Sequence, residues 1–330
     1  MLYAEDLTAM QVSHDRPLVT IVCPVFNEEQ SVELFYGRLG ATMAATEARV
    51  RYELLFINNR STDRTLQIIQ ELSTKDSRVH YLTLSRNFGY QASITAGMRH
   101  AKGDCVVNID VDCEDPPEMI PRFIDKWLAG ADIAYGIRHK REEFVLMHLA
   151  RKLFYRVTRR LADHEIILDM AEFFLVDKRV RDFALSSRST FPFVRSQVGY
   201  VGFKREGIPY KRERRIAGET HYNVLSAIRF GLAGILSSST LTLRLLAYVG
   251  AVICPIDFVG AVALVAGEPP LSSSSLERVV GAILLLHAGW FALGLGALGL
   301  YLARLYKDSV GLPLYIIDEP SSSYRDPVDN

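Results

Sequence analysis

Short apolar runs, each bounded by turn residues, recur along the first 140 positions of the chain. The runs lie at 18–24, 52–57, 79–84, 104–109 and 132–137. Stretches with the apolar spacing of helices lie between them, near 30–47, 63–75, 89–101 and 117–129. Strand-like runs that alternate with helical stretches predict a parallel sheet covered by helices. Because the runs are almost continuously apolar, both faces of that sheet are expected to be buried. The sequence therefore predicts an α/β domain.

Polar side chains gather where four of these runs end. They occupy Pro24–Glu29, Asn58–Asp63, Ser85–Asn87 and Asp110–Asp115. Ligands of open α/β sheets bind outside the carboxyl ends of the strands. We therefore expect the functional site at this edge of the sheet.

Two long apolar stretches in the second half of the chain, Leu243–Gly267 and Val279–Ala303, predict membrane helices. Each exceeds the roughly 20 residues that a helix needs to cross a bilayer. Basic residues flank the outer sides of the pair, which by the positive-inside rule predicts a multi-pass protein of the cell (inner) membrane with both termini and the catalytic domain cytoplasmic. The alternative is a pair of buried helices in a soluble core.

A basic stretch precedes these helices. Residues 204–215 carry six basic and two acidic side chains, and 216–240 follow with apolar residues at helical spacing. An amphipathic helix beside basic residues can lie in a membrane interface. A helix packed on the protein core is the competing interpretation.

Overall charge and cysteine content exclude other classes. The 38 Lys and Arg balance 38 Asp and Glu, whereas dedicated nucleic-acid binders carry a basic excess, so no nucleic-acid partner is expected. The four cysteines lack paired spacing, which favours a reduced intracellular set over disulfides or a zinc site.

The sharpest local motif is the acidic pair Asp110 and Asp112, directly after a predicted strand. Mg²⁺ takes oxygen ligands, usually one or two carboxylates together with substrate phosphates. Such a metal would neutralise a diphosphate leaving group. The chain lacks phosphate-loop and dinucleotide glycine motifs, so the pair favours transfer of a group attached to a diphosphate. Asp115 is expected to cap the helix that follows it.

The chain resembles family 2 glycosyltransferases of the GT-A (Rossmann-like) fold, specifically bacterial polyisoprenyl-phosphate glycosyltransferases of the GtrB and dolichol-phosphate sugar synthase group. The resemblance extends from residue 18 to about residue 317. It rests on motifs in order and spacing: Pro24–Glu29, Ser61–Thr65, Leu84–Gly89, Ala96–Gly97, Asp110–Asp112, Asp115–Glu118, Tyr135–Arg138, Lys152–Arg156, Val198–Phe203, Gly218–Thr220, Tyr301–Tyr306 and Pro313–Tyr315.

This resemblance implies an inverting transfer of a sugar from a nucleotide diphosphate, with UDP favoured, to polyprenyl phosphate. Asp110 and Asp112 would hold Mg²⁺ or Mn²⁺, and tetramers are expected. The residues expected to bind the nucleotide sugar are Pro24, Phe26, Glu28, Asn59 and Asp110. Cations expected to contact phosphate or the acceptor are Arg138, Lys140, Arg141, Lys211, Arg212 and Arg215.

Two departures from the family pattern bear on specificity. Asn59-Arg60 replace Asp-Gly. Asparagine donates as well as accepts hydrogen bonds, so the first replacement bears on recognition of the base, and the loss of glycine bears on a tight turn. Ala171–Phe174 replace Gly-Asp-Phe-Arg. Glu172 keeps the carboxylate that is expected to act on the acceptor, either as a base or by orienting the phosphate. Asp112 and Glu172 are together the expected catalytic residues. A structural pairing of Glu172 with an arginine is the alternative.

The sequence thus predicts five parts. They are an N-terminal tail (1–17), the glycosyltransferase domain (18–215), the interface helix (216–240), a two-helix transmembrane region (241–303) and a C-terminal tail (304–330). Two other functions stay open: transfer to a different lipid-linked or glycan acceptor, and a catalytically weakened nucleotide-binding scaffold.

Overall fold

The computed structural model describes residues 16–138, 170–186, 192–215 and 273–324, with short pieces between 248 and 262. The chain forms two compact units, one made of 1–144, 167–221 and 313–330, the other of 145–166 and 222–312. Lys140, Arg141, the predicted interface helix and almost all of the N-terminal tail lie outside the described residues.

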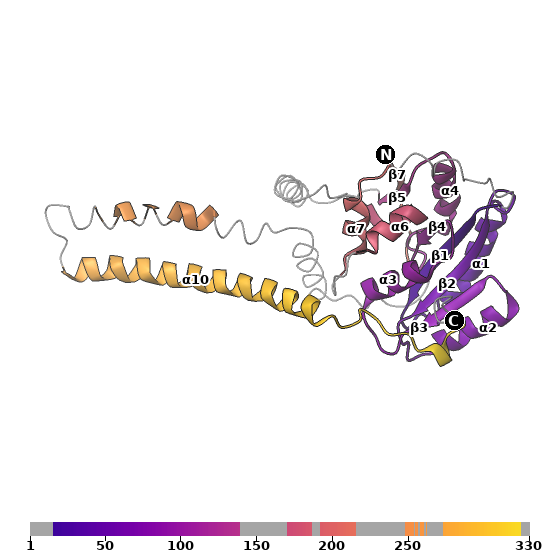
Figure 1. Cartoon of the computed structure of the whole chain (residues 1–330), viewed down its shortest axis with the longest axis horizontal. Helices are drawn as coiled ribbons and strands as arrows, with labels where there is room; N and C mark the ends of the chain where they lie inside the picture. The colour runs from indigo at the N-terminus through magenta and orange to yellow at the C-terminus, as the bar shows by residue number, and fades with distance from the viewer. Residues whose placement is uncertain are drawn as a thin grey trace, which may run out of the picture. The chain divides into compact units, whose positions relative to one another are not determined.

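A seven-stranded sheet forms the centre of the first unit, in the order β3-β2-β1-β4-β6-β5-β7 (Figure 1). Strand β6 is antiparallel to both its neighbours, and the other strand pairs are parallel. All five apolar runs form strands, which confirms a mostly parallel α/β sheet. The strand bounds are β1 Leu18–Val25, β2 Arg51–Asn58, β3 Val79–Thr83, β4 Cys105–Asn108, β5 Ile133–Arg138, β6 Met170–Asp177 and β7 Arg205–Tyr210.

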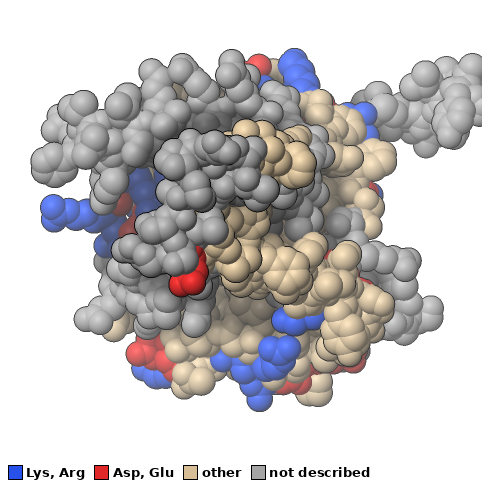
Figure 2. All heavy atoms as spheres, turned by 90° about the vertical axis from the view of Figure 1, so that its left-hand side faces the viewer, with Lys and Arg blue, Asp and Glu red and all other residues tan. Residues whose placement is uncertain are grey.

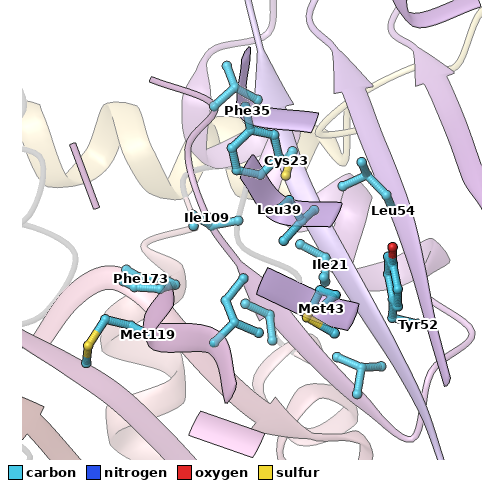
Figure 3. Close-up of a cluster of buried hydrophobic side chains, with 14 of the residues drawn as sticks. Ile21, Cys23, Phe35, Leu39, Met43, Tyr52, Leu54, Ile109, Met119 and Phe173 are labelled. Carbon is cyan, nitrogen blue, oxygen red and sulfur yellow. The ribbon is translucent and has the colours of Figure 1, made fainter. Parts of the chain in front are cut away.

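Helices cover both faces of this sheet, as its continuously apolar strands require. The helix bounds are α1 Val32–Ala44, α2 Thr65–Lys75, α3 Tyr90–His100, η2 Pro117–Met119, α4 Ile120–Leu128, α6 Lys178–Ala184 and α7 Val194–Tyr200. Apolar residues of α1, α2 and α4 share one buried cluster with strand side chains. Figure 3 shows Phe35, Leu39 and Met43 of α1 in this cluster against Ile21 and Cys23 of β1. Residues of α3, α6 and α7 form a second buried cluster with the strand side chains that point to the opposite face of the sheet.

Strand β6, which was not predicted, carries an acidic residue to the carboxyl edge of the parallel strands. It enters the sheet between β4 and β5 and runs against both, with Asn108 of β4 opposite Phe174. Because β6 is antiparallel, its first residues lie beyond the end of β4. The Asn108 Nδ2 accordingly donates to the backbone oxygen of Glu172 at 2.6 Å. Glu172 and the loop after β4 therefore share one edge.

The second unit contains α10, a helix of 38 residues from Ser273 to Val310. Within the described residues one helix is long and apolar enough to cross a membrane, at Val279–Val310, and Tyr248–Gly260 forms a shorter apolar helix. The prediction of two transmembrane helices is therefore not confirmed. Leu284, Leu286 and Phe291 of α10 are among its exposed apolar side chains. On the face drawn in Figure 2, most of the described surface is uncharged, with charged side chains toward its margins.

The chain returns to the first unit after α10. Residues Pro313–Tyr324, here called the C-terminal strap, include the short helix η3 (Glu319–Ser321) and belong to the unit that contains the sheet. Strand β3 lies at an edge of the sheet, and Leu84, just beyond it, forms an antiparallel bridge with Ile317. The strap thereby covers a sheet edge whose backbone groups would otherwise be open to pairing.

Candidate active site

The loops after β1 and β2 are joined to each other by side chains of Ser61–Thr65. Ser61 Oγ accepts the Asn27 N–H at 3.1 Å, and Thr65 Oγ1 accepts the Glu28 N–H at 2.8 Å. In return, Asn27 Oδ1 accepts the Thr62 N–H at 2.8 Å. The polar residues of this motif therefore fix the shape of the two loops.

Asp110 and Asp112 follow β4 at the same edge of the sheet. Tyr90, the first residue of α3, donates its hydroxyl to Asp110 Oδ1 at 2.8 Å. Burial and the neighbouring charge of Asp112 raise the pKa of Asp110 to about 7. Because the charge of Asp112 disfavours the charged form of Asp110, a cation beside the two carboxylates would stabilise both.

A guanidinium already lies against this acidic group. Arg215 Nη2 is 3.1 Å from Asp112 Oδ2, and its Nη1 is 3.3 Å from Glu28 Oε1. Asp112 and Glu28 both keep less than a sixth of their side-chain surface exposed. The positive charge therefore bridges the end of β1 and the end of β4 at a sheltered position.

Asn59 and Arg60, the first departure from the family pattern, are both accommodated. Asn59 is buried; its Nδ2 donates to Asn87 Oδ1 at 3.0 Å, and its Oδ1 accepts the Phe88 N–H at 2.9 Å. Arg60 adopts φ 62°, in the left-handed region that glycine enters without steric cost. The tight turn is therefore kept, and Asn59 joins the loop after β2 to the loop after β3.

The two remaining residues expected near the nucleoside lie at the end of β1. Pro24 is buried within the strand. Phe26 lies just beyond the strand, with 37% of its surface exposed. An exposed aromatic ring at a polar edge is available to pack against a ligand.

Glu172 lies on the side of the sheet that α3 and α7 cover. Its Oε1 accepts from Gln91 Nε2 at 3.4 Å, whereas its Oε2 is buried with no hydrogen-bond partner among the described residues. Burial raises the pKa of Glu172, an effect that the positive charge of Arg195 opposes. Among the described residues, no arginine forms an ion pair with Glu172, and Arg195 acts on it through its charge.

Asp115 does not cap the following helix, so that prediction is wrong. Its carboxylate accepts from Arg138 Nη2 at 2.9 Å and from the Tyr210 hydroxyl, and the 3₁₀ helix η2 begins after Pro116 without a side-chain cap. Arg212 lies 3.6 Å from Asp115 as well. A buried carboxylate needs such partners, and the strand ends of β5 and β7 supply them.

The six cations expected to contact phosphate differ in their surroundings. Arg138, Arg212 and Arg215 all form ion pairs with acidic side chains of the edge, and Arg212 also pairs with Glu114. Lys211 is exposed. The structure therefore brings three of the six predicted cations to the carboxyl edge beside the acidic pair.

Tyr90 and Gln91, which the sequence analysis missed, are the contacts of Asp110 and Glu172 on α3. Their place directly after the Leu84–Gly89 motif was the available signal. Phe174, the second departure at β6, is fully buried in the cluster under α3, α6 and α7. It is therefore a core residue of this protein.

Comparisons with known proteins identify the family. The model for "Glycosyl transferase family 2" matches residues 20–182. An uncharacterized glycosyltransferase, YkcC, of Bacillus subtilis (strain 168) is 36% identical over 315 residues, covering 93% of this chain and 97% of the relative. The chain belongs to glycosyl transferase family 2. This glycosyltransferase is also 33% identical over 304 residues to a prophage bactoprenol glucosyl transferase homolog of Escherichia coli (strain K12), covering 91% of this chain and 98% of the relative.

A solved structure shares a more distant likeness with the glycosyltransferase. It is the glucosyl-3-phosphoglycerate synthase from Mycobacterium tuberculosis in complex with Mn²⁺, UDP and glucosyl-3-phosphoglycerate, which is 16% identical with a TM-score of 0.44 and covers 66% of this chain and 76% of that chain. Among the described residues of the glycosyltransferase, no three His, Cys, Asp or Glu side chains gather into a metal-binding group.

Proposed function

We propose that this glycosyltransferase transfers a sugar from a nucleotide diphosphate, preferably UDP, to the phosphate of a membrane polyprenyl phosphate. The full-length similarity to a relative named as a bactoprenol glucosyl transferase homolog supports this acceptor. The helix α10, long and apolar enough to cross a membrane, is consistent with a lipid acceptor.

The observation that carries the proposal is the sheltered cation position between Asp112 and Glu28. Arg215 reaches both carboxylates from the segment after β7. A site in which acidic side chains and a guanidinium lie together suits a ligand that combines a metal ion with an anionic diphosphate. Arg138 and Arg212, with Lys140, Arg141 and Lys211, are proposed to contact the donor diphosphate or the acceptor phosphate.

The acidic pair fits Mg²⁺ or Mn²⁺. Asp110 and Asp112 offer hard oxygen ligands. Burial and the neighbouring charge of Asp112 raise the pKa of Asp110, and a bound divalent cation would favour its charged form. Two carboxylates suffice because such ions usually take their other ligands from water and substrate phosphates. When bound, the metal neutralises the charge that develops on the diphosphate leaving group.

The proposed reaction is a single displacement with inversion. An acceptor phosphate oxygen forms a bond to the anomeric carbon on the face opposite the diphosphate. The bond from that carbon to the diphosphate oxygen breaks, and the nucleoside diphosphate leaves with the electron pair. A fully ionised phosphate has no proton to lose, and a singly protonated one would give its proton to Glu172.

The test is transfer of radiolabelled sugar by the purified full chain. We expect UDP-sugars, screened one by one, to yield a labelled lipid when polyprenyl phosphate is present. Polyprenol without phosphate, at the same concentration, is the matched control and is expected to give no product. Labelling of a glycan acceptor with no labelling of polyprenyl phosphate would overturn the proposed acceptor.

Tyr90→Phe is expected to weaken metal binding without unfolding the protein. The variant removes the hydroxyl that orients Asp110 and keeps the buried ring. Loss of such a supporting contact typically lowers metal affinity by about 10-fold or more. Electron paramagnetic resonance titration of Mn²⁺ measures that affinity directly. Tyr36→Phe, which removes a hydroxyl bonded to Asp76 away from the site, is the control, and equal Mn²⁺ affinity in all three proteins would contradict the prediction.

A further inference from the structure

The C-terminal strap reaches further than the edge of β3. The Ser323 N–H donates to the backbone oxygen of Tyr81 at 3.0 Å, and the Asp318 N–H donates to that of Thr83 at 2.8 Å. Both bonds pair the strap with the edge strand β3. The next bond lies beyond the strand, where the Ser85 N–H donates to the Ile316 oxygen at 2.9 Å. The strap therefore also holds the first residue of the loop after β3.

An ion pair joins the strap to the loop after β2. Arg60 Nη1 lies 2.7 Å from Asp318 Oδ2. Arg60 is held in the left-handed conformation next to Asn59. A non-glycine residue at such a position needs support from its surroundings, and the strap supplies a contact for this side chain.

The two loops held by the strap are also joined to each other. Asn59 donates to Asn87 and accepts the N–H of Phe88, and Asn87 Oδ1 also accepts the Gly89 N–H at 2.9 Å. The strap contacts the neighbours of this network on both sides, at Arg60 and at Ser85. Displacement of the strap would therefore remove one support from each of the two loops.

The rest of the strap is well anchored. Tyr324 is buried, with its hydroxyl 3.3 Å from Glu53 Oε1 and the Lys102 ammonium 4.1 Å from its ring centre. The Tyr315 hydroxyl lies 3.2 Å from His100 Nε2. Contacts at both ends of the strap make it a fixed part of the sheet domain, although it begins three residues after α10 ends at Val310.

We propose that the C-terminal strap is a positioning element of the donor site, in which Asp318 sets the affinity for the nucleotide through Arg60 and the loops that carry Asn59 and Asn87. The inference rests on the proposed function, because it takes Asn59 as a residue of the nucleotide-binding edge. Asp318 has no role in the chemical step, so its effect is confined to donor binding.

Two substitutions at Asp318 remove one or both of its contacts. Asp318→Asn removes the charge, and Asp318→Pro also removes the N–H that Thr83 accepts. We expect the Kd for UDP and the KM for the UDP-sugar to rise up to about fivefold in the first variant and about 10-fold in the second, with kcat unchanged. Calorimetric titration of UDP into the full chain in nanodiscs gives the Kd. Glu319→Gln, one position along the strap, is the control and is expected to leave both constants unchanged.

Exchange of the charges separates positioning from a general loss of stability. Arg60→Asp is compatible with a left-handed residue, and together with Asp318→Arg it restores an ion pair of opposite polarity. We expect the double variant to bind UDP within about twofold of the wild type. If Asp318→Pro leaves the Kd for UDP unchanged, or lowers kcat at constant KM, the strap inference is wrong while the proposed function stands. A wild-type chain that binds neither UDP nor GDP overturns the proposed function and the strap inference together.

Discussion

Asp112→Asn is expected to lower kcat by about 10³-fold at saturating donor, because metal-assisted charge stabilisation contributes several kcal/mol to such reactions. The Asp112 Oδ1 accepts the Glu114 N–H at 3.0 Å, and its Oδ2 faces Arg215. Asparagine can keep the first bond but offers an NH₂ group to the guanidinium. The variant therefore loses the charge of the acidic pair while the loop keeps its local hydrogen bond. Sugar transfer to polyprenyl phosphate, measured with excess Mn²⁺, gives the comparison.

Two measurements make the Asp112 result specific. Chelation of divalent metal by EDTA is expected to abolish transfer by the wild type, and Mn²⁺ titration is expected to show much weaker binding to Asp112→Asn. Asp125→Asn applies the same change to a surface residue paired with Arg49 and is expected to leave turnover unchanged. Wild-type turnover that persists in EDTA, or an Asp112→Asn variant within threefold of the wild type, would rule out the proposed metal site.

Local sequence patterns were sufficient to predict five of the seven strands. The strands β1 to β5 are apolar runs whose residues pack under helices of matching periodicity, so each element carries its own signal. The site edge followed from a general rule about parallel strands. Both inferences depend only on neighbours within a few residues in the sequence.

Strand β6 and the partners of the acidic residues depended on distant pairing. Asn108 meets Phe174 only because β6 inserts against the direction of the sheet, and no short window of sequence specifies that insertion. Arg215 and Glu28 form their ion pair across 187 positions. Asp115 was expected at a helix cap because caps are local, and the more distant Arg138 and Tyr210 satisfied it instead.

The C-terminal strap also depends on contacts between residues far apart in the sequence. Its Pro313–Tyr315 motif was visible in the sequence, but nothing local indicated that the following residues pair with β3. Arg60 gave no local signal either, since its left-handed backbone resembles that of glycine while its side chain binds Asp318. A departure from a family pattern can therefore keep the backbone shape and add a contact.

Glu172→Gln is expected to lower the rate of sugar transfer by about 10²-fold, the usual contribution of a positioned acid or base. The oxygen of the new amide can still accept the hydrogen bond from Gln91. An NH₂ group then takes the place of the buried Oε2. The two roles of Glu172 predict different constants. If Glu172 accepts a proton, kcat falls and the KM for polyprenyl phosphate stays constant. If it orients the phosphate, that KM rises and kcat at saturating acceptor is kept.

Glu172→Asp and Gln91→Glu complete this experiment, since both act on the same contact. The aspartate variant shortens the side chain by one methylene and keeps the charge, so activity above that of Glu172→Gln is expected. Gln91→Glu places a second carboxylate 3.4 Å from the first and removes the donor of their hydrogen bond. Repulsion then disfavours the charged form of Glu172, and the variant is expected to lose activity as Glu172→Gln does. Transfer rates equal to the wild type in Glu172→Gln and Gln91→Glu would show that this buried carboxylate has no part in the reaction.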